Sequence, residues 1–207
     1  MPLPSLTDQA RRLVELGVHD LAGVSSDDLL AVASAAPSTS AGELIVTGAP
    51  ASALTPLLRL DGPAGFVVED MTDVDDFRPT PEAVVPGRVH TVAGLDRGDA
   101  HRDRTPEETL PVLLGAGRSP LTVEEGLHWA LVDPGVLERN HCFMTIGSRL
   151  RRVDGSYDAR TPALWISNGT GRDGRHRAGA PKLGWCWWGN RHTWLGIASC
   201  TERSSLA

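Results

Sequence analysis

The 207-residue sequence has only three cysteines, one tyrosine and a single lysine, Lys182, against nineteen arginines. An odd number of cysteines without close spacing excludes the disulfide framework of a small secreted domain and favours reduced thiols. No apolar run approaches the roughly 18 residues that cross a bilayer. The opening residues Met1-Pro2-Leu3-Pro4 lack the basic and apolar regions of a signal peptide. These absences predict a cytoplasmic protein without a membrane segment.

Positive charge is scarce in the first part of the chain. The net charge of −6 combines −12 over residues 1–148 with +6 over residues 149–207. This separation can steer an anionic partner to the C-terminal part, or the two parts can attract each other within one fold. The overall acidity argues against a nucleic-acid partner. A hydrophobic content of 41% supports one sizeable core.

Capping residues and hydrophobic spacing predict four helices. Ser5 or Thr7 and Ser25 or Ser26 can cap two short helices that form a hairpin, followed by a linker over residues 38–42. Thr105 can cap a third helix that begins with Pro106. Thr122 and Glu125 have the spacing of a capping box. The predicted helices run to Leu16, Ala36, Gly115 and Val132.

Short apolar or alternating runs predict the strands, at residues 43–47, 65–69, 88–93, 142–146 and 163–167. Helices come early and strands cluster late, which favours an α+β fold over alternating βαβ units. We therefore expect a helical hairpin arm over residues 1–37 and a single α+β domain over residues 43–207, together forming one unit. The sheet is expected to be mainly antiparallel and closed by a C-terminal, tryptophan-rich β-hairpin.

That hairpin is predicted in residues 182–200, which hold four of the six tryptophans. Two aromatic runs flank Gly189-Asn190, and glycine in the first position of a two-residue loop is typical of a type II′ turn. The resulting register pairs Trp185 with Trp194 across the strands. Because side chains alternate along a strand, it also places Trp187 and His192 together on one face.

Six strings in the second half of the chain are distinctive: GRSPLTVEEG from Gly117, NHCF from Asn140, GSR from Gly147, PALWIS from Pro162, PKLGWCWWGN from Pro181 and HTWLGIASC from His192. Together they resemble an actinobacterial family known as a domain of unknown function, DUF5701. The resemblance covers Leu13 to Cys200 and implies a single cytosolic bacterial domain, with no activity or site residues to transfer. Residues 150–161 and 169–180 are longer than the connections of that family.

The predicted register disfavours a local metal site, and thiol catalysis is disfavoured on separate grounds. Cys186 and His192 point to opposite faces, while His192 and Cys200 lie roughly 26 Å apart along an extended strand. A site drawn from distant segments, such as His90, His141 and His192, stays open. Buried cysteines are usually small apolar fillers. We therefore predict no metal site, and the sequence names no cofactor.

Charged segments are read mainly as surface features. The acidic run at residues 70–76 lacks the ligand spacing of a calcium loop and is interpreted as solvated. The glycine-rich, basic segment at residues 169–177 is either a mobile surface loop or a site for phosphate or carboxylate. Glu124 and Glu125 diverge by about 100° on a helix. We interpret them as cap and surface charge rather than as an acid–base pair.

Two functions fit these patterns. The first is a small-molecule binding protein or enzyme that acts on a small polar or anionic ligand beside the hairpin. Trp187, Arg149, Arg175 and Arg177 would bind the ligand, and His192 or His141 would be the general acid or base if a reaction is catalysed. The alternative is a non-catalytic interaction domain whose helical arm or basic loop meets a protein partner.

Overall fold

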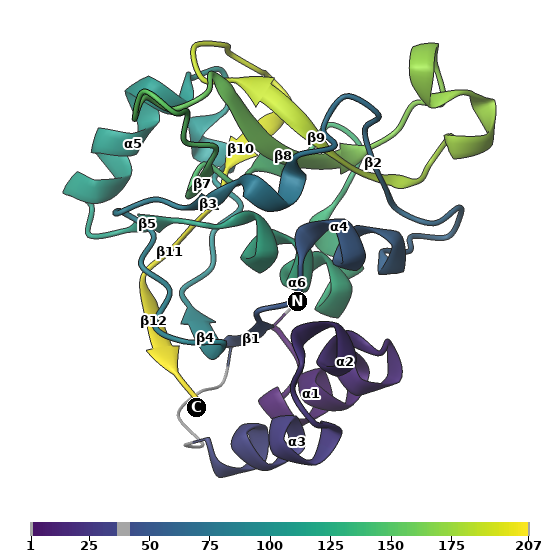
Figure 1. The fold of residues 1–207 in the computed structure, drawn as a ribbon. Helices are drawn as coiled ribbons and strands as arrows, with labels where there is room; N and C mark the ends of the chain where they lie inside the picture. Colours follow the sequence, from purple (N-terminus) through teal and green to yellow (C-terminus); the bar gives the residue numbers. More distant parts are fainter. Residues whose placement is uncertain (1, 37–41, 207) are drawn as a thin grey trace.

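A computed structural model describes residues 2–36 and 42–206 of the chain (Figure 1). Residues 38–41 of the predicted linker lie outside the described residues. The fold is α+β, as the order of the elements predicts. Its strands are mainly antiparallel, but the largest sheet is mixed.

Three helices form the N-terminal arm: α1 (Leu6–Glu15), α2 (Val18–Ala22) and α3 (Ser26–Ala35). Ser5 and Ser25 accept hydrogen bonds from the backbone of Asp8 and Asp28, which confirms the predicted starts of α1 and α3. Helix α2 was not predicted. It fits between two glycines, Gly17 and Gly23, whose left-handed φ angles of 72° and 64° turn the chain.

Helix α6 (Val123–Val132) lies between the two main sheets and contacts α1, α4 (Ala51–Leu54), β1 and β8 (Figure 1). Helix α5 (Pro106–Gly115) lies further out. The predicted capping residues Thr105 and Thr122 begin α5 and α6. Single 3-10 turns lie in the connections at Thr55–Leu57, Val74–Asp76, Asp99–His101, Pro134–Val136, Gly171–Asp173 and Arg175–Arg177.

The strands form two main sheets and two short ladders. The three-stranded sheet has the order β1 (Leu44–Thr47), β4 (Val89–Ala93), β12 (Glu202–Ser205). The five-stranded sheet has the order β10 (Leu195–Ile197), β6 (Cys142–Met144), β8 (Arg160–Ile166), β9 (Pro181–Trp187), β2 (Phe66–Val67). The short ladders join β11 (Ser199–Cys200) to β5 (Ser119–Pro120), and β3 (Arg78–Pro79) to β7 (Ser148–Arg149).

The predicted tryptophan-rich hairpin is not formed in the described chain. Strand β9 pairs with β8 on one side and β2 on the other, so both of its edges are occupied. Strand β10 joins the opposite end of the sheet, parallel to β6. Gly189 does not have the positive φ that a type II′ turn requires in its first central position. The register that paired Trp185 with Trp194 is therefore wrong.

One continuous apolar core joins the arm, α6 and the sheets. Leu13 and Leu29 from the arm, Leu127 from α6, and Phe143 and Leu183 from the five-stranded sheet are all fully buried in it. Within residues 2–36 and 42–206, no helix has the length and apolar character needed to cross a membrane.

Candidate functional site

The capping box at the start of α6 is the local structure on which the candidate site is built. The Thr122 hydroxyl accepts from the backbone N–H of Glu125 at 3.3 Å, and the Glu125 carboxylate accepts from the backbone N–H of Thr122 at 2.8 Å. The predicted cap is therefore confirmed. Glu125 is not a surface charge, however, because it is completely buried.

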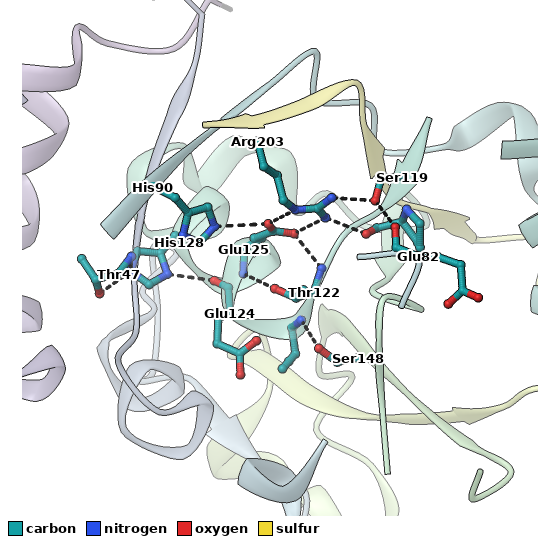
Figure 2. A network of polar contacts seen from close by, with 12 residues as sticks. Thr47, Glu82, His90, Ser119, Thr122, Glu124, Glu125, His128, Ser148 and Arg203 are labelled. Carbon is teal, nitrogen blue, oxygen red and sulfur yellow. Dashed lines mark hydrogen bonds and ion pairs between the residues drawn. The ribbon is translucent and has the colours of Figure 1, made fainter. Parts of the chain in front are cut away.

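A buried arginine from the C-terminal strand compensates the charge of Glu125 (Figure 2). Arg203 of β12 donates from Nε and Nη2 to the two carboxylate oxygens at 2.5 and 2.8 Å. His90 of β4 places Nε2 3.3 Å from Oε1. Burial alone raises the pKa of Glu125, but the hydrogen bonds from Arg203 and His90 outweigh it and lower the pKa to about 2. Glu125 is therefore a fixed negative charge.

Further hydrogen bonds hold the Arg203 guanidinium. It donates to the Ser119 hydroxyl at 2.6 Å and to the Pro120 carbonyl at 2.8 Å. Ser119 in turn donates to the carbonyl of Glu82. Because the planar guanidinium is bound on several sides, the ion pair has one orientation.

His128, one turn along α6, is held in its neutral form. Its Nε2 accepts from the backbone N–H of Thr47 at 3.1 Å, so the proton lies on Nδ1, which donates to the carbonyl of Glu124 at 2.8 Å. Burial lowers the pKa of His128 to about 4. The imidazole thus joins β1 to α6 as a structural hydrogen-bonding group.

The Glu124 side chain points away from the Glu125–Arg203 pair (Figure 2). It lines a cavity of about 310 Å³, referred to below as the Glu124 cavity. Burial raises the pKa of Glu124 to about 7; the charge of Glu125 adds to this effect, and a hydrogen bond from Thr122 and the charge of Arg78 oppose it. The sequence-based interpretation of Glu124 as a surface charge is wrong, because the side chain is partly buried and lines this cavity.

The rest of the cavity combines apolar surface with a few polar groups. Ala49, Pro50 and Val85 supply part of the apolar wall. Arg78, Arg88, His90 and Asp75 supply charged or titratable groups, and the Asp75 carboxylate accepts hydrogen bonds from the backbone N–H and the hydroxyl of Ser52. A small pocket with convergent polar groups and a perturbed carboxyl is typical of a ligand or active site.

The residues predicted to bind or act on a ligand lie elsewhere, in separate places. Trp187 ends β9, is 46% exposed and packs edge to face on Trp185, with ring centroids 4.6 Å apart. His192 precedes β10 and packs against Trp194 at 5.6 Å. The aromatic contacts therefore place Trp187 and His192 in different pairs.

The predicted arginines and second histidine are also dispersed. Arg149 is buried in β7, with its guanidinium 3.9 Å from the ring of Trp188. Arg175 is exposed in the long loop between β8 and β9. Arg177, in the same loop, stacks on Phe66 at 4.3 Å. His141 lies before β6, with Nδ1 3.7 Å from the Asp99 carboxylate.

The three cysteines are free and buried. Burial raises the pKa of the Cys142 and Cys200 thiols to about 11 and that of Cys186 to about 12. A thiol with a raised pKa is a poor nucleophile near neutral pH. The described part of the chain also brings together no group of three histidine, cysteine or acidic side chains that could hold a metal ion.

Sequence reasoning missed Arg203, set Glu124 aside as a surface charge, and considered His90 only as a ligand of a long-range metal site. One local signal in the sequence did separate the two glutamates. The capping box fixes Glu125 at the third position of α6, so Glu124 must point to a different side of the helix. The environment of both glutamates depends on residues far away in sequence. Arg203 lies 78 positions and His90 35 positions from Glu125, and residues between Thr47 and His90 line the Glu124 cavity.

Comparison with known proteins gives a family but no characterised relative. No curated protein and no solved structure matches the chain significantly. The profile of a family of unknown function, DUF5701, matches residues 12–206. It covers the arm from the last part of α1 onward, α6, and the strands that supply His90 and Arg203. The chain belongs to this family of unknown function, DUF5701.

Proposed function

We propose that the protein binds a small polar or anionic molecule in the Glu124 cavity and that Glu124 exchanges a proton with it. The observation that carries this proposal is the opposite environment of two adjacent glutamates. Arg203 holds Glu125 ionised. Glu124 instead lines a cavity, and the pKa of its carboxyl group is about 7. Carboxyl groups whose pKa values are pushed apart in this way are typical of acid–base sites, and a pKa near the working pH suits proton transfer.

The charges around Glu124 support an anionic ligand. The Arg78 guanidinium has no hydrogen-bond or ion-pair partner among the described side chains, and Arg78 lines the same cavity. Arg88 also lines it and makes only long contacts, 3.4 and 3.5 Å, with backbone carbonyls of α2 and its end. Guanidinium groups that are not already paired can bind a carboxylate or phosphate with two parallel hydrogen bonds.

His90 supplies a second polar group in the cavity. It is 3% exposed, its Nε2 contacts Glu125, and its Nδ1 has no partner among the described atoms. A buried ring nitrogen without a partner costs free energy that a ligand hydrogen bond can recover. The ligand class is thus the one predicted from the sequence, whereas the proposed site lies at the start of α6 rather than beside β9.

The first test measures the Glu124 carboxyl directly. We expect ¹³C NMR titration of side-chain carboxyls to show one glutamate with a midpoint near pH 7, which is absent in Glu124→Gln. Glu107→Gln is the matched control, because Glu107 holds the same second position in α5 but is exposed. A spectrum without a glutamate that titrates above pH 6 would contradict the proposal.

The second test measures binding. A panel of small mono- and dicarboxylates is screened by thermal shift and then by calorimetry. Arg78→Gln should weaken binding of any hit about tenfold or more, the effect of losing one charge-assisted hydrogen bond. Binding that is unchanged in both Arg78→Gln and Glu124→Gln would place the ligand elsewhere.

An interaction domain remains the second candidate. It is favoured by two exposed apolar side chains, Leu21 of α2 at 41% and Trp187 of β9 at 46%. A protein partner whose binding is lost in Leu21→Ser or Trp187→Ser, but unaffected by Glu124→Gln, would favour this function over the first.

A further inference from the structure

A different cavity, of about 310 Å³, lies beside the five-stranded sheet. Its lining includes two indoles, Trp165 of β8 and Trp194 before β10, and three polar side chains, Arg139, Asn140 and Asn168. We call it the indole cavity. It shares no residue with the Glu124 cavity. The function proposed above therefore neither requires nor explains it.

The two indoles form a corner rather than a slot. Their ring centroids are 6.0 Å apart and their planes meet at 70°. Both side chains are half-buried. A flat nucleobase stacked between two aromatic rings needs them nearly parallel. A corner instead offers one indole face to a ring that stacks on it, with space at the edge of that ring for polar groups.

The polar side chains are unpaired and come from two separate connections of the chain. Arg139 and Asn140 form the tight turn between Glu138 and His141, whose backbones exchange hydrogen bonds of 3.2 and 3.0 Å. Asn140 adopts a left-handed φ of 66°, which asparagine tolerates better than most residues. Asn168 follows directly after β8 and Ser167. None of these three side chains has a hydrogen-bond or ion-pair partner among the described residues.

The side chains that line the indole cavity favour a ring with several hydroxyl groups over a cationic ligand. Two amides and a guanidinium offer both donors and acceptors, which match a ring carrying several hydroxyl groups. The described residues that line the cavity include no acid, so a cationic ligand has no counter-charge. The electron-rich face of an indole attracts the polarised C–H groups of a sugar ring. The volume is near the lower end of ligand pockets, roughly 300–1,000 Å³, and suits one ring.

A neighbouring cavity, which shares Trp165 and Asn168 with the indole cavity, is less suited to a ligand, although it is similar in size. It is lined by Lys182 and Asp173, which already bind each other at 2.8 Å, and by Arg172 and Asp70, which pair at 2.9 Å. A ligand there would first have to break these ion pairs. The indole cavity imposes no such cost, because its polar groups have no protein partner to lose.

We propose that the indole cavity binds a monosaccharide ring, with Trp165 or Trp194 stacking against it and Asn140, Asn168 and Arg139 binding its hydroxyl groups. The free guanidinium of Arg139 adds a preference for a uronic acid over the neutral sugar of the same configuration, since it can hold a carboxylate. The bound ring can be a free monosaccharide or the end of a glycan.

Binding is measured by saturation-transfer NMR and tryptophan fluorescence with glucose, galactose, mannose, glucuronate and galacturonate as probes. We expect at least one probe to bind saturably, with millimolar affinity. A uronate should bind about 5- to 10-fold more tightly than its neutral counterpart. Arg139→Gln should abolish that difference in affinity, and Asn168→Ala should weaken the binding of both the uronate and the neutral sugar. Arg12→Gln is the matched control, because Arg12 is also exposed and lies on α1, away from the cavity.

The fluorescence change should disappear in Trp194→Phe or Trp165→Phe and persist in Trp187→Phe, which removes an exposed indole that lies outside the cavity. Circular dichroism confirms that each variant is folded, and the exposed Arg139 and Asn168 variants test the site even if a tryptophan variant unfolds. The proposal is overturned if no probe binds saturably. It is also overturned if Arg139→Gln and Asn168→Ala bind the sugars as the wild type does, or if adenosine monophosphate binds this cavity and no sugar does.

Discussion

At the residue scale, the Glu125–Arg203 pair is the interaction whose loss should matter most. Both side chains are almost inaccessible to solvent, with 0% and 6% exposed. Removing one member of a buried ion pair leaves an uncompensated charge, which typically costs about 3–5 kcal/mol. We therefore expect the pair to stabilise the fold and also to hold β12 in one arrangement against β4 and α6.

Arg203→Met should lower the free energy of unfolding by about 3–5 kcal/mol, measured by urea denaturation. The double variant Arg203→Met with Glu125→Leu should recover a substantial part of this loss, because it removes the buried charge along with its partner. If the double variant is as unstable as the sum of the two single variants, the pair is not coupled in the way the geometry indicates.

At the scale of elements, helix α6 connects the sheets and presents both glutamates. Its cap is local, since Thr122 and Glu125 are three residues apart. The same arrangement recurs in α5 with Thr105 and Glu108. The two helices can therefore be compared directly, because Thr122 and Glu124 of α6 line the Glu124 cavity, whereas Glu107 and Glu108 of α5 are exposed.

Thr122→Ala should reduce stability by about 1 kcal/mol through loss of the cap. It should also raise the pKa of Glu124 further, because the hydrogen bond from Thr122 lowers that pKa. Carboxyl NMR titration checks the shift. Thr105→Ala is the control: it removes the equivalent cap of α5 and should leave the Glu124 titration where it is.

Close packing of α6 on the five-stranded sheet gives a second prediction at this scale. A Cβ atom on Gly126 would lie 2.6 Å from Cγ2 of Thr145 and 3.0 Å from the Phe143 ring. Gly126→Ala should therefore destabilise the protein by about 1–3 kcal/mol, as overpacking usually does. Gly115→Ala in α5, where a Cβ meets no atom within 4 Å, should be neutral or slightly stabilising. Thermal unfolding of both variants tests the contrast.

The elements show which features of the fold could be predicted. The starts of α1, α3, α5 and α6 follow from a capping residue and a few neighbours, and these were predicted correctly. The partner of β9 depends on which strand edges the rest of the chain leaves open, so a plausible turn at Gly189-Asn190 led to the wrong pairing. The candidate site escaped prediction for the same reason, because β4 and β12 set the burial of Glu125 and residues between Thr47 and His90 line the Glu124 cavity.

At the scale of the whole molecule, the site couples stability to pH. Glu124 has a raised pKa in the fold, about 7 against an ordinary value of 4.5, so the folded protein binds more protons than the unfolded chain between these values. Its contribution to stability is therefore present below pH 4.5 and is lost as the pH rises towards 7, by up to about 3 kcal/mol. His128 has the opposite slope, because its pKa is lowered from 6.5 to about 4.

The difference between wild type and Glu124→Gln isolates the glutamate. We expect Glu124→Gln to gain stability relative to wild type as the pH rises from 4.5 to 7, and to keep that gain above pH 7. Urea unfolding at several pH values, with Glu107→Gln as the control, measures it. A difference that is flat with pH would show that Glu124 titrates normally in the fold. Below pH 4.5, the lowered pKa of Glu125 should make both proteins lose stability as the pH falls towards 2.

The long sequence separation within the Glu125–Arg203 pair also affects how the protein is made. At about 5–20 residues per second, a ribosome needs several seconds to extend the chain by the 78 positions from Glu125 to Arg203. During that time α6 can leave the exit tunnel with its inward-facing carboxylate still lacking its guanidinium. A nascent chain in this state should keep the start of α6 hydrated, and the N-terminal two-thirds of the protein should close around it only after β12 has emerged.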